Sequence, residues 1–327
     1  SLIKEKNEKL FTLKLLICFE KYKIKMEVNL MAKIVVSGLI NIETTLKVEK
    51  FPIEYTPVNY PFFGIESTIS GVGYNVAKAL YTLGDEVELV SIVGRDINGQ
   101  NSIEIIEKIG INGEFLERAI EETAQSVILY NENGVRQINV DLKDLQETEY
   151  PVEKFEKASE NADISILCNI NFSRQFLQKE KEAGRIVATD VHVLSDIDDE
   201  YNREFLQYSD ILFLSNEHIC GSEEEFVREI YNKYHNKIIV CGLGKNGALI
   251  HVDKEVFKRY SAVETRKIVN TIGAGDALFS AFIHYYIKDK NPHSALEKAI
   301  VFASWKIGEK GAADGFLTEK ELENIIK

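Results

Sequence analysis

The stretch Asn270-Thr-Ile-Gly-Ala-Gly-Asp276 is the most informative part of this chain. It precedes an apolar run, residues 277–283, whose texture is helical. Small residues at 273–275 keep side chains away from the backbone, so their amides can point together at an anion on the helix N-terminus. The carboxylate of Asp276 would weaken an anion site unless it faced a hydroxyl that loses its proton as a phosphoryl group arrives. The alternative is a capping Asp in the first helical turn. The complete Gly-Ala-Gly-Asp pattern favours catalysis.

The composition is that of a globular protein, with 45% hydrophobic and 28% charged residues among 327. The formal net charge of −13 argues against nucleic acid or an anionic membrane surface as a partner. A phosphoryl-transfer enzyme with this charge must hold its polyanionic substrate locally, with backbone amides, a few cationic side chains and a divalent cation. No segment approaches the ~20 apolar residues that span a bilayer.

Four scattered cysteines, Cys18, Cys168, Cys220 and Cys241, lack the spacing of a zinc site or a disulfide framework. They suit a reducing compartment, so we expect a cytoplasmic protein.

Residues 1–30 differ from the rest of the chain. They are rich in lysine around a short apolar patch, and Met31 begins a run that reads like a natural protein start entering a first strand. We expect residues 1–30 to be an extension outside the fold and residues 31–327 to form a single domain. An amphipathic helix that docks on the domain is the competing interpretation, and it stays open.

Strand and helix patterns alternate through the second half of the chain, which is typical of parallel βαβ units with right-handed crossovers. The expected strands are 164–168, 185–189, 211–214 and 238–241, with helices at 172–183, 201–208 and 223–234. A further helix is expected after Gly73. This pattern predicts one doubly wound α/β domain with a mostly parallel sheet flanked by helices.

Two early β regions do not fit that parallel sheet. Residues 41–50 and 62–69 alternate in polarity between prolines, and 126–130 with 135–140 resemble a hairpin around Asn133-Gly134. Each piece is too short to hold a core of its own. We expect these segments, about 41–69 and 124–140, to form a small accessory β structure.

With these motifs, the sequence resembles the PfkB carbohydrate kinases, the ribokinase-like family of sugar and nucleoside kinases, from about residue 32 to the end. The family signature D-T-x-G-A-G-D aligns with 270–276, where Asn270 replaces the first Asp. The resemblance implies a ribokinase-like fold in which the accessory strands form a lid over the substrate. It also implies that Asp276 is the general base and that the amides of Gly273, Ala274 and Gly275 form the anion hole.

Two motifs match the acceptor site of that family. Residues 70–75 correspond to the loop G-G-x-G-x-N, with Gly71, Gly73 and Asn75 in place and Ser70 where the first Gly is usual. The pattern G-x-x-N-x-D corresponds to residues 38–43, with Asn41 matching and Glu43 replacing the Asp. Asn and carboxylate side chains can hydrogen-bond adjacent sugar hydroxyls. Solvated lid residues are the alternative, and the two departures leave the acceptor undecided.

The run Gly242-Leu-Gly-Lys-Asn-Gly247 fits the dinucleotide fingerprint, but a strand pattern follows it instead of a helix. Without a helix N-terminus the pyrophosphate site of dehydrogenases is missing. The resemblance instead implies a nucleotide loop containing Gly242, Gly244 and Gly247; a plain hairpin is equally compatible. Asn216 and Thr271 are the other nucleotide-side candidates. Asn216 keeps only half of the family motif N-x-x-E, and Asp190, which ends a strand, is a comparable candidate for a metal-bound water. Metal ligands therefore stay unknown.

The sequence thus predicts an ATP-dependent kinase for a hydroxyl of a small sugar or nucleoside, with Mg²⁺ on the phosphates. The resemblance also implies a potassium ion beside residues 270–276, which we call the anion loop. Asn270 removes a carboxylate from that expected potassium site. It further implies a homodimer through the lid. Similarity to nucleoside kinases is slightly greater than to ribokinase itself, and both acceptor classes stay open. The rival function is a non-catalytic sensor of a sugar or nucleotide, suggested by the departures at Glu43 and after Asn216.

Overall fold

A nine-stranded sheet forms the centre of the computed structural model, which describes residues 31–132 and 134–326. The proposed extension at residues 1–30 lies outside the described residues. The strand order is β13-β12-β11-β10-β9-β8-β1-β4-β5. From β11 to β5 every neighbouring pair is parallel, whereas β12 and β13 add an antiparallel edge. The strands are β1 Lys33–Ser37, β4 Glu86–Gly94, β5 Leu116–Ile120, β8 Ile164–Leu167, β9 Ile186–Val193, β10 Ile211–Ser215, β11 Ile238–Gly242, β12 Ala248–Val252 and β13 Lys258–Tyr260. The predicted doubly wound fold is confirmed.

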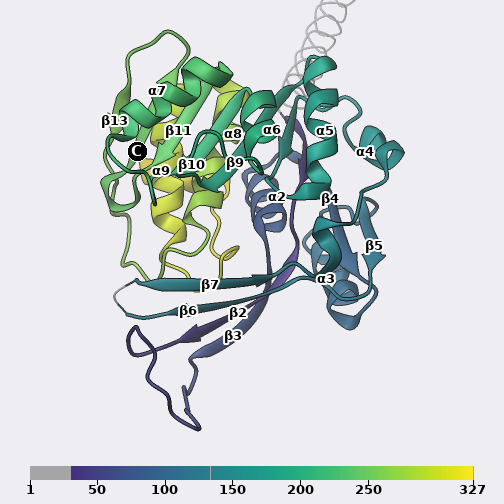
Figure 1. Cartoon of the computed structure of the whole chain (residues 1–327), viewed down its shortest axis with the longest axis vertical. Coiled ribbons are helices and arrows are strands. Elements are labelled where there is room, and N and C mark those ends of the chain that lie inside the picture. The colour runs from purple at the N-terminus through teal and green to yellow at the C-terminus, as the bar shows by residue number, and fades with distance from the viewer. Residues whose placement is uncertain (1–30, 133, 327) are drawn as a thin grey trace, which may run out of the picture. The chain divides into compact units, whose positions relative to one another are not determined.

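Helices cover both faces of this sheet, with α5, α6 and α7 on one face and α2, α8 and α9 on the other (Figure 1). They are α2 Val72–Leu83, α3 Ile97–Lys108, α4 Val152–Ala158, α5 Asn171–Glu182, α6 Arg203–Tyr208, α7 Glu223–Tyr234, α8 Ala274–Asp289, α9 Pro292–Lys306 and α10 Glu319–Ile326. Among the described residues, none of these helices has the length and apolarity needed to traverse a bilayer.

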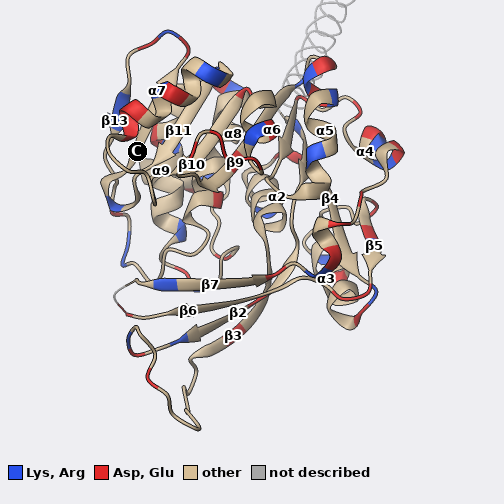
Figure 2. Ribbon diagram, viewed as in Figure 1, with Lys and Arg blue, Asp and Glu red and all other residues tan. Residues whose placement is uncertain are grey.

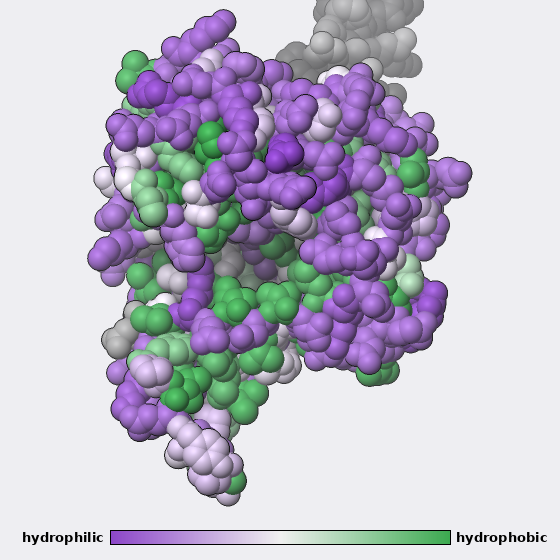
Figure 3. Space-filling view, in the orientation of Figure 1, coloured by the Kyte–Doolittle hydropathy of each residue, from purple (hydrophilic) through white to green (hydrophobic). Residues whose placement is uncertain are grey.

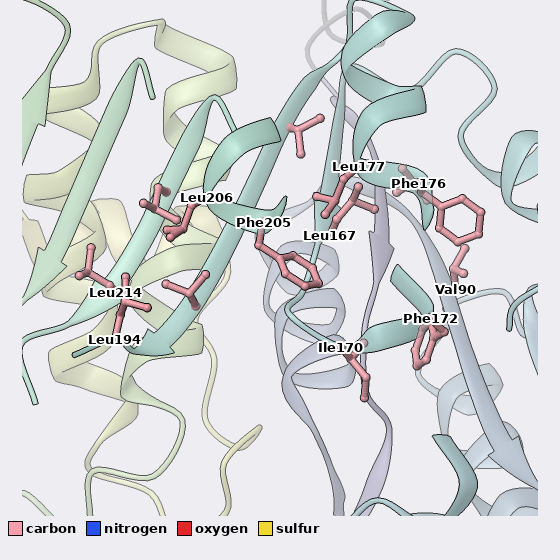
Figure 4. Close-up of a cluster of buried hydrophobic side chains, with 14 of the residues drawn as sticks. Val90, Leu167, Ile170, Phe172, Phe176, Leu177, Leu194, Phe205, Leu206 and Leu214 are labelled. Carbon is pink, nitrogen blue, oxygen red and sulfur yellow. The ribbon is translucent and has the colours of Figure 1, made fainter. Parts of the chain in front are cut away.

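The core follows from strands that are buried on both faces. On β10, Leu212 and Leu214 join the cluster beneath α5, α6 and α7, while Phe213 between them packs against Phe279 and Phe282 of α8, at ring-centroid distances of 4.9 and 5.1 Å. Figure 4 shows part of the first cluster, to which Phe205 and Leu206 of α6 and Leu214 of β10 belong. A continuous apolar run is therefore the expected signature of such a strand.

Local signals explain where the helices begin. Ser222 caps α7 by accepting a hydrogen bond from the Glu225 amide, and three glutamates follow in its first turn, where the helix dipole favours them. Asn291 caps α9 in the same way, with Pro292 at the first helical position. One boundary was predicted wrongly: α2 begins at Val72, so Gly73 lies inside its first turn and not before it.

A separate four-stranded sheet, ordered β3-β2-β6-β7, forms the lid. Its strands are β2 Asn41–Lys47, β3 Ile65–Ser70, β6 Gln125–Tyr130 and β7 Arg136–Asp141. Strand structure was expected at 48–50 and 62–64, but residues 48–64 form an irregular connection that contains three prolines. The buried side chain of Ile128 on β6 clusters with Ile272 and Ala312 of the main domain. The lid therefore contacts the segment that contains the anion loop.

Candidate active site

Hydrogen bonds of its own backbone and of the Asn270 side chain hold the anion loop in place. The Asn270 side chain accepts a hydrogen bond from the Ile272 amide (2.9 Å) and donates one to the Lys310 carbonyl (2.7 Å), so it ties the loop to the segment after α9. Gly273 caps α8 with φ 74°, and a Cβ there would lie 2.3 Å from the Ala312 carbonyl oxygen. Only glycine fits this position, because both its backbone conformation and the space exclude a side chain.

The amides of the loop are not all equivalent. The Ala274 amide donates to the Thr271 carbonyl at 3.3 Å, a long hydrogen bond within the loop. The first-turn amides of Gly275 and Asp276 have no intrahelical acceptor by their position. An anion at this helix end would therefore meet Gly275 and Asp276 first, with Ala274 weakly engaged by the loop itself.

Asp276 lies in the first turn of α8 and is 9% exposed. Its Oδ2 accepts a hydrogen bond from Asn75 Nδ2 at 2.7 Å. Burial raises the pKa of Asp276 above its ordinary value; the Asn75 hydrogen bond opposes this shift, and the charge of Asp190 adds to it. A buried carboxylate that is held in place and has a raised pKa is suited to accepting a proton.

Asn75 links Asp276 to the lid. It lies in the first turn of α2, and its Oδ1 accepts from the Ser70 hydroxyl at 3.4 Å. The same hydroxyl donates to Glu43 Oε2 at the shorter distance of 3.0 Å. Ser70 ends β3, opposite Asn41 of β2, and its hydroxyl bonds Glu43 two residues further along β2. Ser70 stands where the family motif has Gly, and Glu43 stands where it has Asp. The two departures noted in the sequence are therefore physically paired.

Two buried acceptors at this site have no partner among the described residues. They are Glu43 Oε1 and Asn41 Oδ1, although Asn41 Nδ2 donates to the Ser126 hydroxyl at 2.9 Å. Burial raises the pKa of Glu43, the Ser70 hydrogen bond lowers it, and Asp276 lies close enough for its charge to raise it again. A buried acceptor without a donor costs free energy. Both atoms are thus poised to accept hydrogen bonds from a ligand.

Gly71 and Gly73 have packing roles of their own. Gly71 has φ 102°, and a Cβ there would lie 2.4 Å from the Leu39 carbonyl oxygen; at Gly73 it would lie 2.4 Å from the Gly38 carbonyl carbon. The Gly73 amide donates to the Leu39 carbonyl at 3.0 Å. These glycines let α2 approach the end of β1 closely, which positions Asn75. Direct contact of either glycine with an acceptor stays a prediction.

The nucleotide-side candidates lie near the carboxyl ends of β10 and β11. The Asn216 amide donates to the Gly242 carbonyl at 2.9 Å, and the Asn216 side chain lies 3.4 Å from Glu223. Gly244 begins a short 3₁₀ turn with open space around it, whereas a Cβ at Gly247 would lie 1.9 Å from the Tyr260 carbonyl oxygen. Strand β12 follows this loop directly. The prediction that the loop does not lead into a helix, as a dinucleotide-binding loop would, is confirmed.

Two cationic residues at the loop were missed in the sequence. Arg136 of β7 donates to the Thr271 carbonyl at 3.1 Å and lies 3.3 Å from its hydroxyl, so the lid holds the start of the anion loop. Lys306, at the end of α9, is fully buried and donates to the Ile272 carbonyl. In the sequence, Lys306 was marked only by its position directly after the mostly apolar residues 299–305.

The surface is hollowed between the lid and the main domain, with hydrophobic side chains along the lid side of the hollow (Figure 3). Over the same face, Lys and Arg are interspersed with Asp and Glu (Figure 2). Within the described part of the chain, no group of three His, Cys, Asp or Glu side chains could hold a metal ion.

The chain resembles known proteins over most of its length. A family model described as pfkB family carbohydrate kinase matches residues 31–319. The deoxyribokinase of Salmonella typhi is 26% identical over 312 residues, covering 90% of this chain and 98% of that protein. The 5-dehydro-2-deoxygluconokinase of Clostridium botulinum strain Eklund 17B is 25% identical, covering 89% of this chain and 96% of that protein.

Solved structures share the fold. A microbiome-derived acarbose kinase superimposes with a TM-score of 0.81 at 22% identity, covering 90% of this chain and 99% of that one. Arabidopsis thaliana ribokinase, complexed with ribose and ATP, superimposes with a TM-score of 0.75 at 21% identity, covering 91% and 99%. Because the family model matches nearly the whole described chain, this protein belongs to the pfkB family of carbohydrate kinases and has a ribokinase-like fold.

Proposed function

We propose that this kinase transfers the γ-phosphoryl group of ATP to a hydroxyl of a small, neutral sugar or nucleoside, with Asp276 as the general base. The observation that carries the proposal is the position of the Asp276 carboxylate. It is buried in the first turn of α8, directly after the glycine loop, and is joined through Asn75 and Ser70 to the lid residue Glu43. A base and an anion site are thereby brought to one helix end.

The proposed step follows from these positions. The acceptor hydroxyl gives its proton to the Asp276 carboxylate as its oxygen forms a bond to the γ-phosphorus. The bond from that phosphorus to the β–γ bridging oxygen breaks, and ADP leaves. The amides of Gly275 and Asp276 stabilise the charge on the transferring group, with Gly273 and Ala274 shaping the loop. Magnesium, when bound with the nucleotide, would neutralise phosphate charge, with Asn216 and Asp190 as the candidate side-chain partners.

The acceptor class follows from the charges at the acceptor side. Asn41, Glu43 and Asn75 supply hydrogen-bond acceptors and amide donors but no cation. The unpartnered Glu43 Oε1 and Asn41 Oδ1 would accept from two hydroxyl groups. A sugar that carries a carboxylate would place it close to Glu43 and Asp276, which is unfavourable at a buried site because the nearby Lys306 ammonium group is already engaged with the Ile272 carbonyl. We therefore infer a neutral polyol as acceptor. Among the relatives, the deoxyribokinase is named for a neutral sugar, whereas the 5-dehydro-2-deoxygluconokinase and the ribose-1-phosphate kinase are named for anionic acceptors. The proposal of a neutral acceptor therefore rests on the side chains at this site and not on the relatives.

A phosphorylation screen tests this function. Pentoses, deoxypentoses, hexoses, nucleosides and sugar acids are incubated with ATP and Mg²⁺, ADP release is followed, and the product is identified by mass spectrometry. The Asp276→Asn variant, purified in parallel, measures contaminating kinase activity. The proposal predicts turnover with a neutral acceptor. Turnover with sugar acids alone would overturn the acceptor class. Tight binding of one acceptor without any turnover would favour the sensor function.

We also propose that the enzyme is a homodimer through the lid. The lid connection exposes large apolar side chains, with Phe62 84% and Phe63 100% exposed, and Tyr55 and Tyr60 nearby. Val127, Ile138 and Val140 on the lid strands are about half exposed as well. Ile138 and Val140 share the face of Ile128, which packs on the main domain, whereas Val127 lies on the opposite face of the lid. Exposed apolar side chains favour association, and a second copy of the lid would cover Val127 and the aromatic residues of the connection. Free Cys168, Cys220 and Cys241 suit the reducing cytoplasm, where we place the enzyme.

A further inference from the structure

Lys306 ends α9 with its side chain fully buried. Among the Lys and Arg residues that the structure describes, it alone belongs to the buried class. Its ammonium group donates a hydrogen bond to the carbonyl of Ile272, within the anion loop. Lysine is rarely buried in full because desolvation of the ammonium group is costly, so a specific interaction must hold it there.

Four carboxylates near Lys306 offset part of the cost of burying its ammonium group. Burial lowers the pKa of Lys306 to about 8, and the carboxylates of Asp276, Glu43, Asp314 and Glu309 oppose that shift. These carboxylates come from α8, from the lid strand β2 and from the segment after α9. The ammonium therefore lies where the proposed base, the acceptor side and the back of the anion loop meet.

The same place does not suit a potassium ion. The family resemblance implies a potassium ion held by carbonyls near 270 and 271, with a carboxylate at 270. Here position 270 is a neutral Asn, and its side chain is engaged at both ends, by the Ile272 amide and the Lys310 carbonyl. The Thr271 carbonyl already accepts from Arg136, and the adjacent Ile272 carbonyl accepts from Lys306. A potassium ion beside 270 and 271 would compete with these cations for carbonyl oxygens and would meet the Lys306 charge in a buried setting.

The Ile272 residue is a structural centre of the loop. Its side chain packs against Ile128 of the lid and Ala312 after α9, and its amide is fixed by Asn270. A cation on its carbonyl completes the constraint, because the amide and the carbonyl of Ile272 are then both paired.

We propose that the Lys306 ammonium group takes the place of a monovalent cation beside the anion loop, so that the enzyme works without potassium. This inference rests on the proposed kinase function. Lys306 acts through the loop, as a positioning residue, and contacts neither the acceptor nor the transferring phosphoryl group. The neutral side chain at Asn270 and the buried positive charge of Lys306 are then two parts of one arrangement.

The first test uses the wild-type enzyme at constant ionic strength, with potassium, sodium or choline chloride at about 100 mM. At pH 7, below the lowered pKa of Lys306, its ammonium group is mainly protonated, so we expect rates within about twofold of one another. A saturable activation by potassium of about fivefold or more would overturn the proposal.

The second test removes the ammonium group in two ways. Lys306→Ala leaves space beside the Ile272 carbonyl, and Lys306→Met fills that space without charge. In choline, both should lose about tenfold or more in turnover, because the loop is less well fixed. Potassium or ammonium should restore most of the loss in Lys306→Ala but not in Lys306→Met. Equal behaviour of the two variants in all salts would show a purely structural role and contradict the proposal.

A control on the same helix is Lys298→Ala, whose ammonium group pairs with Asp289 at 3.1 Å, away from the loop. It should show no dependence on the cation. ADP affinity by calorimetry and melting temperature, each in potassium and in choline, provide readouts that need no acceptor. Potassium-strengthened ADP binding by the wild type would overturn the inference even if the variants failed to fold. If no acceptor is phosphorylated while ADP binding is independent of potassium, the kinase proposal fails and the cation inference stands.

Discussion

The two sides of the site are built differently. The anion loop relies on backbone: Gly273 at positive φ, the first-turn amides of α8, and carbonyl contacts from Asn270 and Lys306. The acceptor side relies on a relay of side chains from Glu43 through Ser70 to Asn75. Backbone geometry tolerates little change in sequence, whereas a side-chain relay can be altered in pairs. We therefore propose that the loop carries the common chemistry and that the relay carries the choice of acceptor.

Of the changes that compare the loop backbone with the side-chain relay, a change at Gly273 should lower turnover most. Gly273→Ala forces a Cβ to within 2.3 Å of the Ala312 carbonyl oxygen at φ 74°, so the loop must move. We expect turnover to fall about 100-fold or more, with weaker ATP binding. Steady-state kinetics over a range of ATP concentrations measure both. Gly184→Ala, in the turn between α5 and β9, is the control, since Gly184 has the same φ of 74° but open space around it. Near-normal turnover of Gly273→Ala would show that the loop geometry is dispensable.

A buried ion cluster farther along α8 should affect stability and not chemistry. His284 Nδ1 lies 2.8 Å from Asp85, and its Nε2 lies 3.6 Å from Glu319. Burial alone would lower the pKa of His284, but these carboxylates raise it from 6.5 to about 9. A raised folded-state pKa gives stability that is complete below pH 6.5 and is lost as pH rises through 9. The difference corresponds to about 3 kcal/mol.

Urea unfolding of the wild type and His284→Gln between pH 6 and 9.5 measures this contribution. The gap in unfolding free energy should be widest at the acid end and close above pH 9. His293→Gln, which alters a more exposed pair with Glu255, should cost under about 1 kcal/mol. A gap that did not narrow with rising pH would show that packing and not charge holds His284.

The Ser70–Glu43 pair is the test of the acceptor side. Ser70→Gly restores the family residue but removes a hydrogen bond to a buried carboxylate, worth about 1.5–3 kcal/mol. The acceptor KM should rise about tenfold while the KM for ATP stays constant. Combining it with Glu43→Asp in a double-mutant cycle should give less than the sum of the single effects. Strict additivity would mean that the two departures are independent.

The lid surface should affect assembly only. Phe62→Glu places a charge on a side chain that is already 84% exposed, so the fold should be unaffected. The variant should be monomeric at micromolar concentration by light scattering, whereas the wild type should be dimeric. Val256→Glu, 87% exposed in the β12–β13 turn, should leave the dimer intact. A monomeric wild type would contradict the dimer proposal.

Local patterns were sufficient for much of the fold. The α7 helix was predicted with its observed ends, because a serine cap and a run of glutamates mark its start. The strand β5, Leu116–Ile120, was missed because its alternation is weak and its pairing with β4 is a tertiary contact. The prolines in 48–64 were recognised as turn signals, yet the strands predicted beside them extended too far into this connection, because β2 ends at Lys47 and β3 begins at Ile65.

The site shows the same division. The anion loop could be predicted because seven consecutive residues define it. The hydrogen bond between Ser70 and Glu43 joins residues 27 positions apart, and that between Lys306 and Ile272 joins residues 34 apart. Such contacts depend on how β2, β3, α8 and α9 meet, which no local pattern contains. The departures at 43, 70 and 270 were visible in the sequence, but their compensation was not.

The most direct test of the account is the turnover of Asp276→Asn. Asparagine keeps the size of the side chain and can still accept the hydrogen bond from Asn75, but it cannot take a proton. Turnover should fall by about 10²–10⁴-fold, since general base catalysis contributes that much. Acceptor KM should change little, and unfolding free energy by no more than about 1 kcal/mol. Asp289→Asn at the other end of α8 should be neutral for turnover. Near-normal turnover of Asp276→Asn would contradict the general-base assignment and require a different base.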